Sequence, residues 1–313
     1  MSSEALQMDD EKHPTDIISR FQRATAFLHR SQEIRGVAGR NAVADEHNSD
    51  LLIIAEGFSR TAEKYDSFAE DHPHLTRIRN KVYAHIEWFV SKGDHILELN
   101  AGTGADAAEL ARRGYFVHAT DISPGMLARA QDKSQRPELA NRMTVQSCSF
   151  TQLEKVHRGP YDAVFSNLGG LNCIADLTPV IQQLPLVLKP DGLAIWVLMP
   201  PICLWEVAEL FRGHPKLAFR RFAKNGTRTH LEGMYFNVHY FTPQQVIAWF
   251  GTDYDCLAIE GLSVITPTAE SKNFAKRFPR LYQSLAWLDD RLAARLPWRG
   301  WGDFYILTMR LRP

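Results

Sequence analysis

Short apolar runs alternate with amphipathic stretches along this chain from about residue 75 onward. In the amphipathic stretch that ends near Phe89, Leu75, Ile78, Val82 and Ile86 fall on one helical face. Short apolar runs bounded by turn residues are typical of buried strands. We therefore predict strands at residues 95–99, 115–120, 143–148, 161–166 and 193–199, with helices at 75–89, at 105–113 and up to about 133.

The C-terminal third continues with a different order of elements. Thr242 and Pro243 have the residue types expected at the cap and first position of a helix. Apolar spacing at Leu281, Leu285 and Leu288 indicates a later helix. We predict two helices and a strand pair around Gly233 within 200–241, helices at 242–250 and near 281–292, and strands at 256–265 and 304–311.

Strands that alternate with helices require crossover connections, which are found in parallel sheets. Because crossovers are right-handed, successive helices cover both faces of such a sheet. We therefore predict an α/β fold, a Rossmann-like doubly wound seven-stranded mostly parallel sheet with helices on both faces and an inserted α+β cap. Pro185 interrupts the apolar run from Leu177 to Leu188, so we expect a kinked or shortened helix there.

The same pattern divides the chain into four segments. Within the first, helical spacing of Ile17, Phe21, Ala24 and Leu28 is followed by Gly- and Asn-bearing text at 35–50, which we interpret as a linker. This arm is a candidate lid or homodimer contact. We predict an N-terminal arm and linker at 1–50, a ligand-binding core at 51–199, a substrate cap at 200–241, and a completion of the sheet with added helices at 242–313.

Composition narrows the functional classes. The formal net charge of the 313-residue chain is zero, which gives no electrostatic argument for a nucleic-acid partner. The four cysteines form no CxxC pair, so we expect no metal site and a reduced, cytoplasmic protein. The longest apolar run, 193–205, contains Pro200 and Pro201 and is too short to span a bilayer, so we expect no stable membrane insertion.

The segment from Ile96 to Asp106 contains the clearest candidate site. A predicted strand leads into a loop with Gly102 and Gly104, which opens a helix. Glycines let the backbone approach a ligand closely, and the helix start provides free amide donors. The second strand ends at Asp121, whose carboxylate can accept both hydroxyls of a ribose.

The text ELNAGTGADAAELARRGYFVHATDISPGMLARAQ resembles the class I S-adenosylmethionine (SAM) dependent methyltransferases of the small-molecule type. The resemblance implies SAM as cofactor and S-adenosylhomocysteine as product. It also implies that Tyr65, in the segment from Phe58 to Asp66, lies over the sulfonium, where an aromatic face favours a cation. FSNLGGLNC is similar to the family's fourth motif. By this resemblance the cofactor-binding residues are Tyr65, Glu98, Asn100, Gly102, Gly104, Asp121, Ile122, Met126, Ser149, Phe150, Asn167 and Leu168.

Two positions depart from the family pattern. Asn100 stands where the first glycine of the loop is usual. The third strand usually ends in an acidic residue that binds the adenine amine, whereas this chain has Ser149 and Phe150. We expect Ser149 to accept the amine and Phe150 to stack on the adenine.

Two other functions compete with a methyltransferase. Gly102, Gly104 and Ala107 also satisfy the G-x-G-x-x-A form of a nicotinamide dinucleotide site, so an NAD(P)-dependent oxidoreductase is the alternative enzyme. The second competing function is that of a non-catalytic partner protein that has the SAM-binding fold. Glu98 within the first strand and the Tyr65 segment do not belong to the nicotinamide pattern and favour SAM.

The acceptor is expected to bind under the cap. Seven aromatic residues lie between residues 200 and 240, at 205, 211, 219, 222, 235, 236 and 240, together with six basic residues and no acid between Glu209 and Glu232. We therefore expect methyl transfer to an O, N or C atom of a small hydrophobic acceptor, with an anionic group as an added feature. The candidate general bases are His239 and Tyr240. The candidate substrate residues are Asn172, Trp205, Arg220, Arg221 and Tyr235.

Overall fold

The computed structural model describes residues 41–69 and 72–313. Residues 46–313 form one compact unit, and the contacts below lie within it. Its main sheet has seven strands in the order β3-β2-β1-β4-β5-β9-β8. They are β1 (His95–Leu99), β2 (Phe116–Asp121), β3 (Met143–Ser147), β4 (Tyr161–Ser166), β5 (Leu188–Leu198), β8 (Tyr254–Leu262) and β9 (Phe304–Leu311).

The pairing is parallel from β3 to β5, whereas β9 runs antiparallel to both β5 and β8. The α-helices are α2 (Asn41–Ala69), α3 (Pro73–Phe89), α4 (Ala105–Arg112), α5 (Pro124–Ser134), α6 (Thr178–Ile181), α7 (Leu204–Val207), α8 (Pro215–Ala218), α9 (Pro243–Phe250), α10 (Phe274–Arg277) and α11 (Pro279–Leu292). The 3-10 helices are η2 (Leu153–Lys155), η3 (Gly170–Cys173), η4 (Leu184–Leu186), η5 (Ala208–Arg212), η6 (Arg220–Phe222), η7 (Gly251–Asp253), η8 (Ala269–Ser271) and η9 (Trp298–Gly300).

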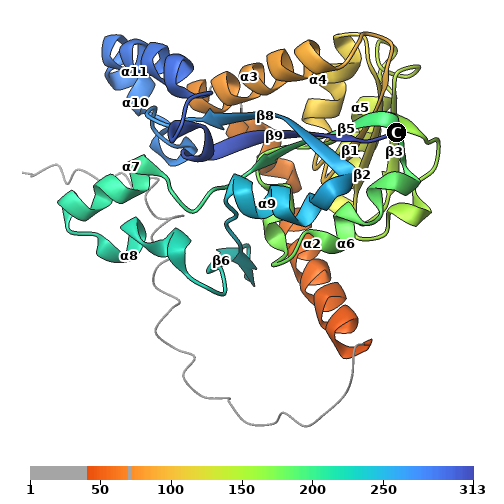
Figure 1. Ribbon diagram of the computed structural model, residues 1–313, viewed down its shortest axis with the longest axis horizontal. Helices are drawn as coiled ribbons and strands as arrows, with labels where there is room; N and C mark the ends of the chain where they lie inside the picture. Colours follow the sequence, from red (N-terminus) through yellow and green to blue (C-terminus); the bar gives the residue numbers. More distant parts are fainter. Residues whose placement is uncertain (1–40, 70–71) are drawn as a thin grey trace, which may run out of the picture. The chain divides into compact units, whose positions relative to one another are not determined.

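Helices cover both faces of this sheet (Figure 1). One core cluster joins α6 and α9 to the sheet and includes Leu97 and Trp196. The other joins α3 and α4 to the opposite face and includes Ile78 and Ile96. Neighbouring residues of β1 enter different clusters because side chains alternate across a strand. The predicted fold class is confirmed.

The cap consists of short elements and a hairpin, β6 (Thr227–Leu231) with β7 (Met234–Val238). Gly233 lies in the turn with φ of 90°, so the predicted strand pair is confirmed. Thr242 accepts a hydrogen bond from the amide of Gln245, which confirms the cap of α9. The run from Leu177 to Leu188 is divided between α6 and η4, as Pro185 predicted.

Two local predictions were wrong. Residues 41–50 are helical and belong to α2, whereas we interpreted 35–50 as a linker. Residues 1–40 lie outside the described part. The four-residue spacing of Lys216, Arg220 and Lys224 would place them on one helix face, but α8 ends at Ala218 and η6 begins at Arg220. Local spacing did not show this interruption because it depends on where Arg220 and Arg221 find partners.

Candidate functional site

The loop between β1 and α4 contains three left-handed residues, Asn100, Gly102 and Gly104, with φ of 53°, 55° and 72°. A Cβ on Gly102 would face open space, because the nearest atom is Met126 Sδ at 4.0 Å. A Cβ on Gly104 would lie 2.7 Å from Met143 Cε. Gly102 therefore leaves room for a ligand, whereas Gly104 allows α4 to pack against its neighbours.

Asp121 ends β2 beside this loop. Its Oδ2 accepts a hydrogen bond from the Gly102 amide at 2.9 Å, and its Oδ1 accepts one from the Ser123 amide at 2.8 Å. Burial raises the pKa of Asp121, and these backbone hydrogen bonds act against the rise. Each carboxylate oxygen has two lone pairs, so acceptor capacity remains for a diol such as a ribose.

Glu98 lies in β1 and is only 1% exposed. Among the residues described, none makes a hydrogen bond to its Oε2. Burial raises the pKa of Glu98 well above its usual range, the nearby Asp106 carboxylate raises it further, and the Arg79 guanidinium opposes the rise. A buried carboxyl with an open oxygen is costly unless a ligand supplies a donor, so Glu98 fits a ligand that carries an amine.

A cluster around Asp106 joins this loop to α3 and β4. Tyr83 donates a hydrogen bond to Oδ1 of Asp106, and Asn167 Nδ2 donates one to Oδ2 at 3.0 Å. The Nε of Arg79 lies 3.1 Å from Oδ1. The sequence analysis missed Arg79 and Tyr83. They lie one turn apart on α3, so helical spacing could have placed them together.

The segment of α2 that contains Tyr65 is held against the loop. Asp66 Oδ1 accepts from Thr103 Oγ1, and Asp66 Oδ2 accepts from Lys133 Nζ, both at 2.5 Å. Ser59 Oγ accepts from the Gly125 amide at 2.7 Å. These contacts place α2 beside both the glycine loop and the start of α5.

Tyr65 itself is half-buried in this segment. Burial raises the pKa of its phenol, and the charges of Arg79, Asp106 and Asp121 also act on it. The neighbouring Asp66 contacts Thr103, so Tyr65 lies in the part of α2 that is held at the glycine loop. This position is compatible with the predicted contact to the cofactor, which stays a prediction.

The remaining predicted cofactor residues divide into two groups. Met126 is the nearest neighbour of the Gly102 Cβ position, and Ile122 and Leu168 are half-buried after the ends of β2 and β4. Phe150, in contrast, is 5% exposed and packs in the core. Its ring is therefore largely enclosed by core residues, and the expected stacking on adenine stays a prediction.

Ser149 makes a local turn instead of an open acceptor site. Its hydroxyl lies 2.8 Å from Thr151 Oγ1 and accepts a hydrogen bond from the Thr151 amide at 3.2 Å. The predicted contact with the adenine amine would have to share this hydroxyl with Thr151.

A cavity of about 400 Å³ lies between the start of α2, η3 and the segment that follows β7. Burial and the negative charge of Asp121 raise the pKa of the Cys173 thiol to about 12. Cys173 ends η3, and a Cβ on Gly170 at the start of η3 would lie 2.8 Å from Asn100 Cβ, so η3 lies against the glycine loop. Both candidate bases are in its wall. The lining residues are Asp50, Leu51, Cys173, Ile174, Ala175, Ala223, Lys224, Asn225, Gly226, Asn237, His239, Tyr240, Phe241 and Gln245.

The two candidate bases differ in their surroundings. Burial raises the pKa of Tyr240, although the charges of Arg220 and Arg221 lower it. A phenol with a raised pKa stays protonated at neutral pH and is suited to donate a hydrogen bond. His239 is consequently the better candidate for accepting a proton.

Asn172 does not face this cavity as a substrate ligand. Its side chain is fully buried and donates to the carbonyls of Met199 at 3.2 Å and His239 at 2.6 Å. Its Oδ1 accepts from the Met199 amide at 3.0 Å. Asn172 therefore positions the backbone of His239, and its predicted substrate contact is wrong.

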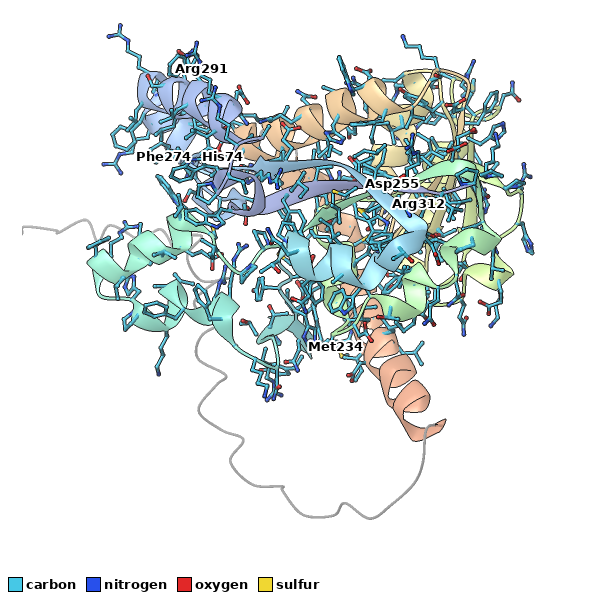
Figure 2. All side chains as sticks on the ribbon, in the orientation of Figure 1. His74, Met234, Asp255, Phe274, Arg291 and Arg312 are labelled. Carbon is cyan, nitrogen blue, oxygen red and sulfur yellow. The ribbon has the colours of Figure 1, made fainter. Side chains whose placement is uncertain are left out.

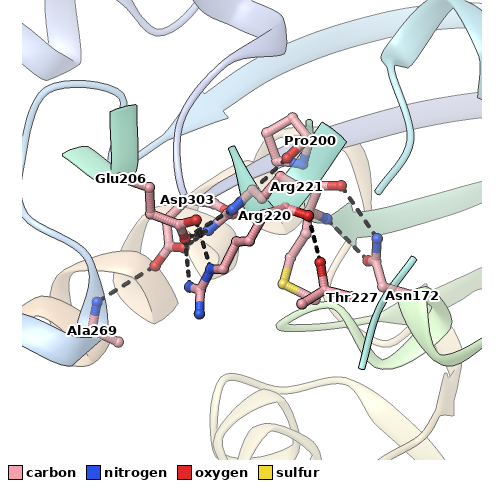
Figure 3. Close-up of polar contacts among 9 residues, drawn as sticks. Asn172, Pro200, Glu206, Arg220, Arg221, Thr227, Ala269 and Asp303 are labelled. Atoms are coloured by element: carbon pink, nitrogen blue, oxygen red, sulfur yellow. Dashed lines mark hydrogen bonds and ion pairs between the residues drawn. The ribbon is translucent and has the colours of Figure 1, made fainter. Parts of the chain in front are cut away.

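Arg221 forms the centre of a buried ion cluster (Figure 3). Its Nη2 donates to Glu206 Oε1 at 2.6 Å and to Asp303 Oδ1 at 2.8 Å. Arg220 forms two further hydrogen bonds with Glu206, at 2.8 and 2.7 Å. Burial would raise the pKa of Glu206, but both guanidinium groups act to lower it.

This cluster corrects the prediction that Arg220 and Arg221 bind an anionic acceptor. The cap lacks acids between Glu209 and Glu232, but the neutralising acids come from Glu206 and from Asp303, which lies far away in the sequence. Cys203, Glu206 and Asp303 bring potential metal ligands within 4.8 Å of one another. The Arg221 guanidinium already supplies the positive charge there.

The aromatic residues of the cap do not gather into one acceptor pocket. Phe211 is 90% exposed, and Phe219 and Phe222 are about half exposed. Trp205 packs edge-on against Phe274 of α10 at 5.5 Å. Of the seven aromatic residues, Tyr240 lines the cavity that holds His239, and the expected hydrophobic acceptor stays a prediction.

Tyr235 lies on the exposed side of β7, where the Arg228 guanidinium is 4.6 Å from its ring. It is absent from the lining of the cavity that holds His239. Its predicted substrate contact is not supported by this position.

Within residues 41–69 and 72–313, none of the helices has the length and apolar character needed to cross a membrane. Residues 96–192 match the family model described as a methyltransferase domain. This segment contains β1 to β4 together with the glycine loop and Asp121.

Three similar proteins illustrate the relationship. A malonyl-[acyl-carrier protein] O-methyltransferase of Halorhodospira halophila is 28% identical over 166 residues, 52% of this chain and 53% of that protein. A demethylmenaquinone methyltransferase of Leptospira interrogans is 28% identical over 145 residues, 45% of this chain and 58% of that protein. The chain thus spans about half the length of these curated relatives. The solved CcbJ methyltransferase from Streptomyces caelestis has a TM-score of 0.55 at 15% identity, covering 83% of this chain and 99% of that one.

Proposed function

We propose that this chain, which belongs to the class I SAM-dependent methyltransferases, transfers a methyl group to an O, N or C atom of a small molecule. The family decides between the two cofactors that the glycine spacing left open, and SAM is the cofactor. The observation that carries the proposal is the Asp121 carboxylate, held by the Gly102 amide beside an open glycine loop. SAM supplies an electrophilic methyl group on a sulfonium when it is bound.

The described residues fit this cofactor. Gly102 leaves space for its backbone contact, and Asp121 keeps acceptor capacity for the ribose hydroxyls. The open Oε2 of Glu98 suits the ammonium group of the methionine moiety. Arg79, which pairs with Asp106, is the cation that we assign to the methionine carboxylate.

We assign the acceptor to the cavity of about 400 Å³ that holds His239 and Tyr240. Small-molecule sites commonly have volumes of about 300–1,000 Å³. His239 would remove a proton from the acceptor where the methylated atom carries one, and Tyr240 would donate a hydrogen bond that orients it. Lys224, in the same wall, replaces Arg220 and Arg221 as the candidate for binding an anionic group.

Binding of SAM tests the cofactor assignment directly. Asp121→Ala should lower the affinity for SAM by about 10- to 100-fold, which corresponds to about 1.5–3 kcal/mol for a charge-assisted contact. Calorimetry measures this affinity, and thermal unfolding with SAM, S-adenosylhomocysteine and NAD provides a second measurement. Stabilisation by NAD alone, or an Asp121→Ala affinity within twofold of wild type, would contradict the proposal.

The acceptor site needs a separate test with matched variants. Lys224→Glu should raise the KM of an anionic acceptor, whereas Lys216→Glu, in the exposed part of α8, should leave it unchanged. His239→Gln should lower kcat while SAM affinity stays at the wild-type value. Equal effects of the two lysine substitutions would show that the cavity does not bind the acceptor.

A further inference from the structure

Helix α11 and its two flanks present apolar side chains to solvent. Within this stretch, Phe278, Leu281, Trp287, Leu288 and Leu296 are between 37% and 68% exposed. Figure 1 shows α11 at an outer edge of the molecule, with α3 on its inner side. We call the surface formed by Arg277, Phe278, Arg280, Leu281, Trp287, Leu288, Arg291, Arg295 and Leu296 the α11 face.

The two acidic residues of this stretch pair with cations of α3, although the side chain of Asp290 remains 56% exposed. Asp289 is fully buried, accepts a hydrogen bond from the Ile265 amide at 2.9 Å, and pairs with Arg77 of α3 at 3.3 Å. Asp290 pairs with Arg77 at 2.5 Å and with Lys81 at 2.9 Å. These contacts fix the rotation of α11 and turn its acids toward α3.

The outer side carries positive charge as a consequence. Residues 272–301 contain seven Lys and Arg residues but only the two acids Asp289 and Asp290. Arg277, Arg280, Arg291 and Arg295 are all exposed on the α11 face. Figure 2 shows Arg291 at the margin of the molecule.

Cations and aromatic rings are combined on this face. The Arg291 guanidinium lies 3.9 Å from the centre of the Trp287 ring, and the Arg277 guanidinium lies 5.3 Å from that of Phe278. An aromatic ring beside a cation is suited to a boundary between water and lipid, where the ring enters the headgroup layer and the cation meets phosphate.

We propose that the α11 face adsorbs to the surface of a lipid bilayer that contains anionic phospholipids. An amphipathic helix with exposed Leu and Trp beside arginines binds such a surface through apolar burial and electrostatic attraction. A second copy of this chain fits the face less well, because a two-fold contact would bring both sets of arginines together. The helix lies on the membrane and does not cross it.

Vesicle sedimentation with the full-length chain tests this proposal. At 0.1 M NaCl the chain should sediment with phosphatidylcholine vesicles that contain a quarter phosphatidylglycerol. Binding should be at least about tenfold weaker with phosphatidylcholine alone or at 0.5 M NaCl, because salt screens the attraction. Equal binding to the two lipid compositions, or no binding to either, would overturn the proposal.

Paired variants locate the contact. Arg280→Glu/Arg291→Glu and Trp287→Ser/Leu288→Ser should each weaken binding to the anionic vesicles at least about tenfold. Trp88→Ser is the matched control, because Trp88 is 84% exposed on α3 outside this face. It should bind within twofold of wild type. Thermal unfolding and S-adenosylhomocysteine affinity establish that the variants are folded and that the cofactor site is unaffected.

The same variants distinguish a membrane surface from a second copy of this chain as the partner of the α11 face. If Trp287→Ser/Leu288→Ser converts a dimer to a monomer in gel filtration and leaves vesicle binding unchanged, the face is a contact between copies and the proposal is wrong. Unchanged vesicle binding by the double arginine variant also overturns it. If a variant fails to fold, the lipid and salt dependence of the wild-type chain decides the question.

Discussion

Removal of the Arg221 guanidinium should destabilise the fold rather than weaken acceptor binding. Arg221→Met keeps the length of the side chain but removes five hydrogen bonds, which end on Glu206, Asp303 and Pro200. Glu206 and Asp303 are 5% and 6% exposed. The substitution leaves both carboxylates with too little positive charge around them.

The expected loss of unfolding free energy is about 3–5 kcal/mol, the usual cost of breaking a buried ion pair from one side. The remaining pair between Arg220 and Glu206 favours the lower end of this range. In a chain of this size each kcal/mol lowers the Tm by about 2–4 °C, so we expect a decrease of about 6–12 °C. Arg220→Met should cost about 1 kcal/mol or less, because this side chain is 30% exposed.

Urea unfolding followed by circular dichroism measures these losses, and calorimetry with S-adenosylhomocysteine measures the cofactor site. Arg212→Met is the control, since its side chain is 72% exposed in a pair with Glu209. A loss below about 1 kcal/mol for Arg221→Met, together with a raised acceptor KM, would refute the structural role and restore the substrate role.

Three further predictions concern the glycine loop, the α2 contact and pH. Gly102→Val should block SAM binding in a folded protein, whereas Gly104→Val should lose stability first through its collision with Met143; thermal unfolding and calorimetry separate the two. Asp66→Asn should weaken SAM binding a few-fold by loosening its ion pair with α5, and normal affinity would argue against α2 as part of the site. Burial lowers the pKa of His74, so unfolding free energy should fall as the pH drops through about 6.5, and His74→Gln should reduce this dependence in urea titrations at several pH values.

Much of the fold and part of the site could be predicted from short stretches of the amino-acid sequence. Strands β1, β4 and β9 match their predicted bounds because each is a buried apolar run with turn residues at its ends. Gly102 and Asp121 could be found because a strand end places a residue at the edge of a parallel sheet, whatever follows later in the chain. The same reasoning did not separate Gly104, whose role depends on its contact with Met143.

The partners of buried charges were decided by the tertiary structure alone. The cap sequence has no acid close to its arginines, but Asp303 pairs with Arg221 from a position 82 residues away. Arg79 and Asp106 likewise come together from α3 and α4, which are neighbours only in the folded chain.

The exposed face of α11 was also predicted only in part from the sequence. Helical spacing of leucines predicts the helix but not which of its faces is buried. The pairs of Asp289 and Asp290 with α3 instead orient the helix so that Leu281 and Leu288 are exposed. A short-range pattern indicates which segments form helices and strands, because helix hydrogen bonds join residues four apart and side chains alternate along a strand. Which face is buried depends on the charges and surfaces that distant segments bring to it.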